Sequence, residues 1–236
     1  MQRGERLRFY LDVVATLAMV AASATLIWTV FAGGRNAPAA AAADAKGGLG
    51  ADMVTDAETT ATPTTLRNGQ PKIAFIEFSD FQCPFCAKYA QETYPQLETE
   101  FVRPGLVSYV FRHFPLSNHA NAFTAGEAAE CAGSQGQYQA MRMSLFVNQR
   151  ALVRPRLPDY AAAIGLNRNA FERCLADGAG RAQVKADIAE GERLGVNSTP
   201  TFFVGEVKRD GTITVFRRIR GAQPYSVIRA ELQKLL

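Results

Sequence analysis

The stretch IAFIEFSDFQCPFC, residues 73–86, decides the fold that we predict for this chain. Residues 73–78 are apolar on both faces apart from one glutamate, which is typical of a strand in the middle of a sheet. Two cysteines, Cys83 and Cys86, follow this strand. Pro84 between them suits the first position of a helix, where its missing N–H is no loss. The sequence therefore predicts that a strand ends and a helix begins at a pair of thiols.

The two thiols are expected to have different environments. Cys83 lies at the helix start, where unpaired backbone N–H groups and the positive end of the helix dipole stabilise a thiolate. Cys86 lies one turn further in and is expected to be less exposed. A CxxC pair can also be half of a zinc site. The other cysteines are single, however, and His113 and His119 are six residues apart, which is not a usual helical ligand spacing. We therefore predict redox chemistry without a metal, and assign neither histidine a catalytic role.

The whole chain has the composition of a globular protein. It has 236 residues, 47% of them hydrophobic, and a formal net charge of +4. This length is enough for one packed domain with additions. The basic residues near the two ends have no aromatic residues interleaved among them, so we expect a membrane flank and a solvated strand face. Nucleic acid is not an expected partner.

The N-terminal residues predict a membrane segment. Residues 1–12 carry three arginines and form a basic flank, and residues 13–32 contain no charge. An uncharged helix of this length spans about 30 Å, the hydrocarbon thickness of a bilayer. The positive-inside rule places the N-terminus in the cytoplasm and the rest of the chain outside. The alternative is a cleaved secretory signal, favoured by the alanine-rich residues 39–45. Either interpretation places the CxxC domain in the periplasm or another extracytoplasmic space.

Residues 33–69 predict a tether. They are dominated by Ala, Gly, Thr, Asp and Pro and contain few large apolar side chains. Such a segment cannot bury enough surface to offset its ordering entropy, so we expect a disordered linker before a folded domain at residues 70–236. A flexible chain of this length has a root-mean-square reach of about 33 Å.

The compartment also determines how the four cysteines pair. Disulfides persist outside the cytoplasm. With Cys83 and Cys86 as the exchangeable pair, Cys131 and Cys174 are left for each other. Such a bond closes a loop of about 44 residues and stabilises the fold by roughly 4 kcal/mol if the geometry permits. The alternative is two buried free thiols.

The folded domain is interpreted as a β-α-β unit followed by a helical insertion. A helix over residues 84–101 and a strand over 106–111 complete the unit. Residues 117–195 show helical patterns, which we interpret as an inserted helical domain. Strands at 201–204 and 212–219, joined by an Asp-Gly turn, precede a C-terminal amphipathic helix. The helices expected in the insertion cover residues 120–132, 137–148, 157–164, 168–176 and 181–194.

Three segments, FIEFSDFQCPFC, FRHFPL and VNSTPTFFVG, together resemble the DsbA-like branch of the thioredoxin superfamily over about residues 70–236. The resemblance implies an α/β thioredoxin-like fold with an inserted helical domain, and thiol-disulfide exchange with cysteine-containing protein substrates, without a cofactor. It makes Cys83 the nucleophile and Cys86 the resolving cysteine. It also implies a cis Thr199–Pro200 bond beside the sulfurs, with Thr199 docking an extended substrate peptide. An ordinary proline at a strand start is the alternative.

Two further residues are candidates for the site. Glu77 is a lone carboxylate among apolar neighbours. A buried, unpaired acid tends to keep its proton, so Glu77 is predicted to relay a proton to or from Cys86. A paired or edge-facing glutamate is the alternative. Phe85 is expected to contact substrate together with Pro84. An apolar rim for substrate, with core packing as the alternative, is expected from Phe81, Phe85 and Tyr89.

These residues predict an extracytoplasmic protein thiol-disulfide oxidoreductase, most simply a dithiol oxidase that is reoxidised by an unidentified membrane partner. Phe85 stands where the best-known members of the family have histidine. Because a phenylalanine carries no charge to stabilise the Cys83 thiolate, the oxidising strength stays open. The alternatives are a disulfide reductase or isomerase of the same fold, a non-enzymatic membrane-tethered chaperone, and a metal-delivery protein.

Overall fold

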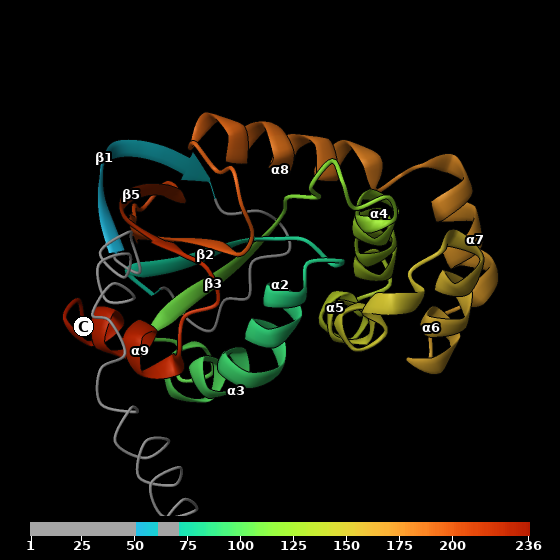
Figure 1. Ribbon diagram of the computed structural model, residues 1–236, viewed down its shortest axis with the longest axis horizontal. Coiled ribbons are helices and arrows are strands. Elements are labelled where there is room, and N and C mark those ends of the chain that lie inside the picture. Colours follow the sequence, from blue (N-terminus) through green and yellow to red (C-terminus); the bar gives the residue numbers. More distant parts are fainter. Residues whose placement is uncertain (1–50, 61–70) are drawn as a thin grey trace, which may run out of the picture. The chain divides into compact units, whose positions relative to one another are not determined.

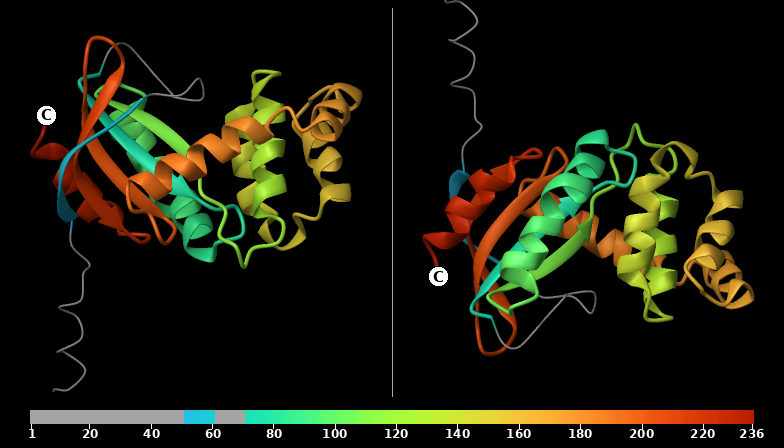
Figure 2. Two further views of the ribbon diagram at one scale, coloured as in Figure 1. Left: turned by 90° about the horizontal axis from the view of Figure 1, so that it is seen from above. Right: turned by 90° about the horizontal axis from the view of Figure 1, so that it is seen from below.

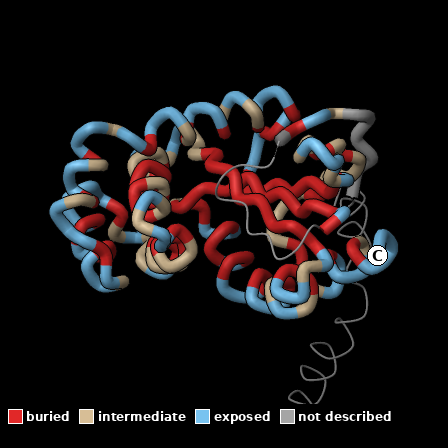
Figure 3. The backbone as a smooth tube through the Cα atoms, turned by 180° about the vertical axis from the view of Figure 1, so that it is seen from behind, coloured by how far each residue is buried: buried red, intermediate tan, exposed pale blue. Residues whose placement is uncertain are grey.

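A computed structural model describes residues 51–60 and 71–236, and five strands within these ranges form one sheet (Figure 1). The strands are β1 (Ala51–Thr60), β2 (Ile73–Ser79), β3 (Val107–His113), β4 (Thr201–Val207) and β5 (Thr212–Arg220). Their order is β1-β5-β4-β2-β3, and β2 pairs in parallel with β3 and antiparallel with β4. Every residue of β2 is buried, as its apolar sequence predicts, and Figure 3 shows the middle of the sheet buried throughout.

Helices cover both faces of this mixed sheet (Figures 1 and 2). They are α2 (Pro84–Lys88), α3 (Tyr94–Leu97), α4 (Ala122–Gly133), α5 (Tyr138–Val147), α6 (Leu157–Ala163), α7 (Arg168–Asp177), α8 (Arg181–Arg193) and α9 (Tyr225–Gln233). α2, α3 and α9 lie on one face and α8 crosses the other, while α4 to α7 group together beside the sheet. The result is a thioredoxin-like α/β fold.

The sheet separates two apolar layers. On the α2 side, the rings of Phe75 and Phe202 stack with their centroids 5.2 Å apart. On the α8 side, the rings of Phe78 and Phe203 meet edge to face at 5.8 Å. Alternate residues of a strand point to opposite faces. Glu77, two residues after Phe75, therefore belongs to the α2 layer.

The helix after the cysteines runs without a break from Pro84 to Val102, one residue past its predicted end. It consists of α2, the π-helical turn η4 (Tyr89–Thr93), α3, and a second π-helical turn, η5 (Glu98–Val102). Pro95 has no N–H to donate, and its ring clashes with the carbonyl of a regular preceding turn. The wider turn η4 lies directly before α3 and takes up this distortion.

Residues 51–60 form the edge strand β1, where the sequence predicted part of a disordered tether. β1 pairs antiparallel with β5, and its buried Thr59 hydroxyl accepts a hydrogen bond from Arg112 of β3 at 3.5 Å. The tether prediction was wrong for this segment because an edge strand tolerates charged residues and needs few large apolar ones. Its acidic and alanine residues hide the strand pattern.

The other expected N-terminal features lie outside the described residues. These are the basic flank 1–12, the membrane segment 13–32, and the parts of the tether before residue 51 and after residue 60. Among the residues that the structure describes, no helix has the length and apolarity needed to cross a bilayer.

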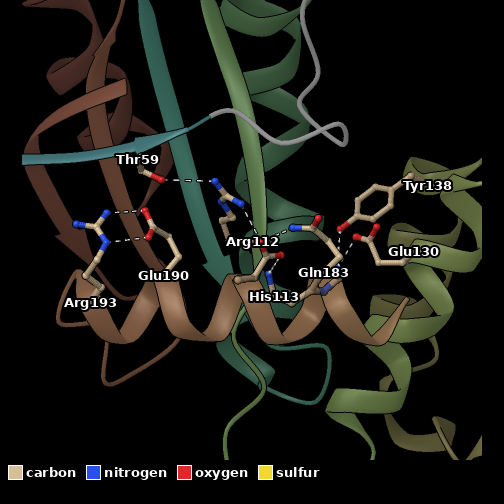
Figure 4. Close-up of polar contacts among 9 residues, drawn as sticks. Thr59, Arg112, His113, Glu130, Tyr138, Gln183, Glu190 and Arg193 are labelled. Atoms are coloured by element: carbon tan, nitrogen blue, oxygen red, sulfur yellow. Dashed lines mark hydrogen bonds and ion pairs between the residues drawn. The ribbon is translucent and has the colours of Figure 1, made fainter. Parts of the chain in front are cut away.

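The five helices expected between β3 and β4 are present as α4 to α8, with ends within two residues of those predicted. A buried polar network fixes α8 to the sheet. Asp187 of α8 accepts hydrogen bonds from Arg112 Nη1 at 2.9 Å and from the backbone N–H of His113 at 3.0 Å. His113 Nε2 lies 2.9 Å from Glu130 Oε1 of α4 (Figure 4). The network therefore joins α8, β3 and α4.

Candidate active site

The two cysteines lie where β2 ends and α2 begins, as predicted. Cys83 is the residue before α2, and its carbonyl accepts hydrogen bonds from the N–H groups of Cys86 and Ala87, both at 3.1 Å. Pro84 lies in the first helical turn. The backbone N–H of Asp80 lies 3.5 Å from Cys86 Sγ, which places the second sulfur against the end of β2. Both cysteines are free thiols in this structure.

Cys83 and Cys86 hold their protons with different strengths. A hydrogen bond with the Cys86 thiol lowers the pKa of Cys83 to about 6 against the opposing effect of burial, and backbone N–H groups at the helix start contribute. Burial, followed by the interaction with Cys83, raises the pKa of Cys86 well above its ordinary value. At pH 7 the first cysteine is therefore mainly a thiolate and the second a thiol. Only the thiolate is nucleophilic.

The loop before β4 approaches Cys83 from a distant part of the chain. The Thr199–Pro200 peptide bond is cis, and in its thiol form Cys83 donates a hydrogen bond to the carbonyl oxygen of Thr199, with Sγ and O 3.3 Å apart. β4 begins at the next residue, where Thr201 pairs with Phe78 of β2. The register of the sheet thus places Thr199 and Pro200 beside the first sulfur.

Glu77 is fully buried, but it is paired, so the prediction of an unpaired acid was wrong. Its Oε2 accepts hydrogen bonds from Arg142 Nη2 at 2.8 Å and from the Tyr109 hydroxyl. Burial raises the pKa of Glu77, while the charge of Arg142 acts in the opposite direction. The partner was missed because α5 supplies it from 65 residues away.

One signal for Arg142 is present in the sequence. In a helix, residues three and four apart share a face. Arg142 shares its face with Tyr138, Leu145 and Phe146, all of them buried. A lone arginine at this spacing among large apolar residues indicates a buried cation, although it does not identify the anion.

Only one of the three residues expected at an apolar rim lies at the surface. Phe85 is 61% exposed, whereas Phe81 and Tyr89 are buried. The Phe81 ring packs on Phe146 at 4.9 Å between centroids, and the Tyr89 ring packs on Phe202 at 4.5 Å. The alternative interpretation, core packing, is therefore right for Phe81 and Tyr89. Pro84 is exposed beside Phe85.

The segment after α5 closes over the start of α2. Gln149 begins the short helix η6 (Gln149–Ala151), and its side-chain amide donates to the carbonyls of Phe81 at 2.9 Å and Cys83 at 2.8 Å. These bonds fix the CxxC loop to the helical part of the chain. A groove of about 370 Å³ lies next to them, lined by residues 146–151 together with Ala87 and Gln91.

Asp80 and the two histidines have structural partners. Asp80 Oδ1 accepts a hydrogen bond from the N–H of Gln82 at 2.6 Å, as expected of a turn residue. Asp80 Oδ2 lies 2.7 Å from His119 Nδ1, and Glu130 is the corresponding partner of His113. Within the described ranges, no three Cys, His, Asp or Glu side chains converge into a possible metal site.

Cys131 of α4 and Cys174 of α7 form a disulfide, with Cα atoms 5.8 Å apart and a sequence separation of 43. Cys131 is fully buried. In the chain-entropy model a loop of this length contributes roughly 4 kcal/mol to stability. The bond ties two of the helices that lie beside the sheet.

A thioredoxin-like sheet with a CxxC pair at a helix start and a cis proline beside it defines a thioredoxin-fold domain. Residues 59–217 match the family model described as "Thioredoxin", and the chain belongs to this family. The fold is that of DsbA-type proteins. It matches α-DsbA1 of Wolbachia pipientis with a TM-score of 0.63 and 20% identity, over 75% of this chain and 92% of that one. The thiol-disulfide exchange protein α-DsbA2 of the same organism gives 0.59 and 19% identity, over 73% and 86%.

Part of the chain is also similar in sequence to ion antiporters. The Na⁺/H⁺ antiporter NhaA 1 of Salinispora arenicola is 34% identical over 144 residues, which is 61% of this chain but 22% of the antiporter. The chain thus spans about a fifth of the length of the curated relatives that it matches.

Proposed function

We propose that the protein is an extracytoplasmic thiol-disulfide oxidoreductase that acts on cysteine-containing proteins, and that its main reaction is dithiol oxidation. The observation that carries the proposal is the contrast between the two thiols. The pKa of Cys83 is about 6, and that of the buried Cys86 is raised well above its ordinary value. The structurally similar α-DsbA2 of Wolbachia pipientis is a thiol-disulfide exchange protein, which supports the same chemistry.

The proposed oxidation has two exchange steps. A substrate thiolate attacks Cys83 Sγ of the Cys83–Cys86 disulfide. This attack forms a mixed disulfide between the substrate and Cys83 and releases the Cys86 thiolate, which takes up a proton. A second substrate thiolate then attacks the substrate sulfur of the mixed disulfide and releases Cys83 as a thiolate. The substrate gains a disulfide, and the two electrons remain on the CxxC pair. Lower pKa makes a thiol a better leaving group, so the second step is fast in this direction.

The acidity of Cys83 also favours the dithiol form of the protein. With a pKa of about 6 in place of 9.0, ionisation at pH 7 stabilises the reduced form by at most about 1.4 kcal/mol, which is about 30 mV for two electrons. Solvent screening at the site reduces this figure. A stabilised dithiol makes the disulfide form a stronger oxidant.

We assign substrate docking to Thr199, Pro200, Pro84 and Phe85. The Thr199 backbone lies beside Cys83 Sγ at the start of β4, so an extended peptide can pair with it next to the sulfur. The exposed ring of Phe85, two residues after Cys83, offers an apolar contact next to the CxxC pair. The proposal is that unfolded segments bind here by backbone pairing and apolar burial.

The location outside the cytoplasm is part of the proposal. The Cys131–Cys174 disulfide supports it, since such bonds persist in oxidising compartments. Residues 13–32 would anchor the chain in the membrane, with the N-terminus in the cytoplasm, and a membrane protein would reoxidise the CxxC pair. We do not propose ion antiport, because the match to the antiporters covers about a fifth of their length.

The direct test mixes the oxidised protein with a reduced, unfolded protein that contains two cysteines. We expect one client disulfide for each CxxC pair reduced, and none with Cys83→Ala. A client that stays reduced would contradict an oxidase. If the reduced protein instead reduced client disulfides and had a reduction potential of about −270 mV, the activity would be that of a reductase.

A further inference from the structure

Arg142 is a fully buried cation that the exchange steps above do not use. It comes from α5, and its side chain has no exposed surface. The guanidinium carbon lies 4.4 Å from the ring centre of Tyr94 and 4.8 Å from that of Phe111. Its anion is Glu77, at 2.8 Å. A buried ion pair often stabilises a fold no better than apolar side chains of similar volume. Stability alone therefore does not explain why this pair lies under the active site.

Among the described residues, the ionisable groups that interact with Glu77 besides Arg142 are phenols. Tyr109 of β3 donates its hydroxyl to the carboxylate. Burial raises the pKa of Tyr89 in η4, Tyr94 in α3 and Tyr138 in α5, so these side chains are neutral at pH 7. Arg142 is thus the cation that faces Glu77. The ionisation of this carboxyl depends on the balance between its burial and the charge of that one side chain.

Ser79 lies between Glu77 and Cys86. Residues 77 and 79 point to the same face of β2, and the next residue, Asp80, has its N–H 3.5 Å from Cys86 Sγ. The buried Ser79 hydroxyl is close enough to Glu77 and Cys86 to lower the pKa of both. Among the described residues, neither Ser79 Oγ nor Glu77 Oε1 has a fixed hydrogen-bond partner. Both atoms are therefore available to pass a proton.

We propose that Arg142 is a positioning residue that keeps Glu77 ionised and oriented to take the proton of Cys86 through the hydroxyl of Ser79. The proposal rests on the thiol-disulfide exchange proposed above. The helical segment between β3 and β4 thereby takes part in the chemistry of the CxxC pair, because α5 supplies Arg142, whose charge favours the ionised form of Glu77.

The proposed proton transfer comes before the attack by Cys86. When Cys83 carries a mixed disulfide, the Cys86 thiol gives its proton to Ser79 Oγ, and the Ser79 proton passes to Glu77. The Cys86 thiolate then attacks Cys83 Sγ, closes the Cys83–Cys86 disulfide and releases the partner as a thiolate. In the oxidase direction the same groups return the proton to the Cys86 thiolate as it leaves.

The first measurement is independent of turnover. Infrared titration of the reduced protein, with Glu77→Gln subtracted, reports the protonated carboxyl of Glu77. We expect Arg142→Met to move this titration to higher pH. Arg142→Lys keeps a positive charge, so its titration should lie close to that of the native protein. Arg112→Met is the matched control, because it removes the cation of the other buried pair, with Asp187, and should leave the Glu77 titration in place.

The second measurement follows Cys86 directly. Reduced protein is mixed with oxidised glutathione, and release of the second glutathione by Cys86 is timed from pH 5 to 9. We expect Arg142→Met to slow this release at pH 7 by about a hundredfold or more, because general base catalysis is lost. In a Glu77→Gln background the same change should slow release no further. Thermal unfolding checks each variant, and the double variant lacks both charges, so it leaves no unpaired buried ion.

Two results would overturn the proposal. One is an unchanged Glu77 titration in Arg142→Met. The other is an equal slowing by Arg142→Met with and without Glu77, which would show that arginine acts on folding or access alone. Either result can occur in a protein that exchanges disulfides normally. A protein that exchanged none would still give the infrared titration, so the two failures are distinguishable.

Discussion

Replacing Cys86 should change the acidity of Cys83 according to whether a hydrogen-bond donor remains at position 86. The Cys86 thiol is the largest cause of the low pKa of Cys83, which is about 6. A hydrogen bond to a charged group contributes about 1.5–3 kcal/mol, and each pKa unit corresponds to about 1.4 kcal/mol. Cys86→Ala should therefore raise the pKa of Cys83 by roughly one to two units, whereas Cys86→Ser keeps an O–H donor and should raise it much less.

The assay is the pH dependence of alkylation of Cys83 by iodoacetamide, which reacts with the thiolate. The native dithiol should show a midpoint near pH 6. At pH 7 the ionised fraction should fall from about 90% to between about 50% and 10% in Cys86→Ala, with the alkylation rate falling in proportion. Equal midpoints for the alanine and serine variants would refute the hydrogen-bond explanation. A native midpoint near the ordinary value of 9.0 would refute the assigned acidity altogether.

Three further predictions follow from the same structure. Gln149→Ala removes the two hydrogen bonds to the carbonyls of Phe81 and Cys83, so we expect a loss of about 1–3 kcal/mol in unfolding free energy and faster amide exchange at the start of α2. Unchanged amide exchange there would show that these two hydrogen bonds do not stabilise the CxxC loop. Replacing Cys131 and Cys174 together by alanine should cost about 2–4 kcal/mol of stability while leaving the Cys83 midpoint unmoved, as urea unfolding and alkylation will show. The pKa of Cys83 is lower in the folded dithiol than in the unfolded chain, so the unfolding free energy of the reduced form, relative to that of the disulfide form, should rise between about pH 6 and pH 9. This gain should be lost as the pH falls through about 6, and calorimetry that finds the opposite slope would contradict the assigned acidity.

The part of the site that is local in sequence could be predicted from it. A strand, a two-residue turn region and a helix start follow one another within residues 73–86, and each leaves its own pattern of burial, breakers and capping. The position of Cys83 at the helix start follows from these patterns. So does the contrast between the two thiols, because depth in the helix determines both burial and access to the backbone N–H groups.

The long-range parts of the site could not be predicted in the same way. Arg142 and Gln149 reach the site from 65 to 68 residues away, and their partners depend on how α5 packs against the sheet. A periodic pattern shows that a helix face is buried, but it does not show what that face meets. For the same reason Glu77 was expected to be unpaired: its strand neighbours are apolar, and its cation lies on another element.

The most direct test of the account is to trap the covalent intermediate at Cys83. Cys86→Ala, reduced and mixed with an unfolded protein that carries a disulfide, has no thiol left to resolve the mixed disulfide. We expect a stable adduct that mass spectrometry assigns to Cys83, that reducing agent releases, and that Cys83→Ala does not form. No adduct at Cys83 from pH 6 to 8, with the variant folded, would contradict thiol-disulfide exchange by this protein.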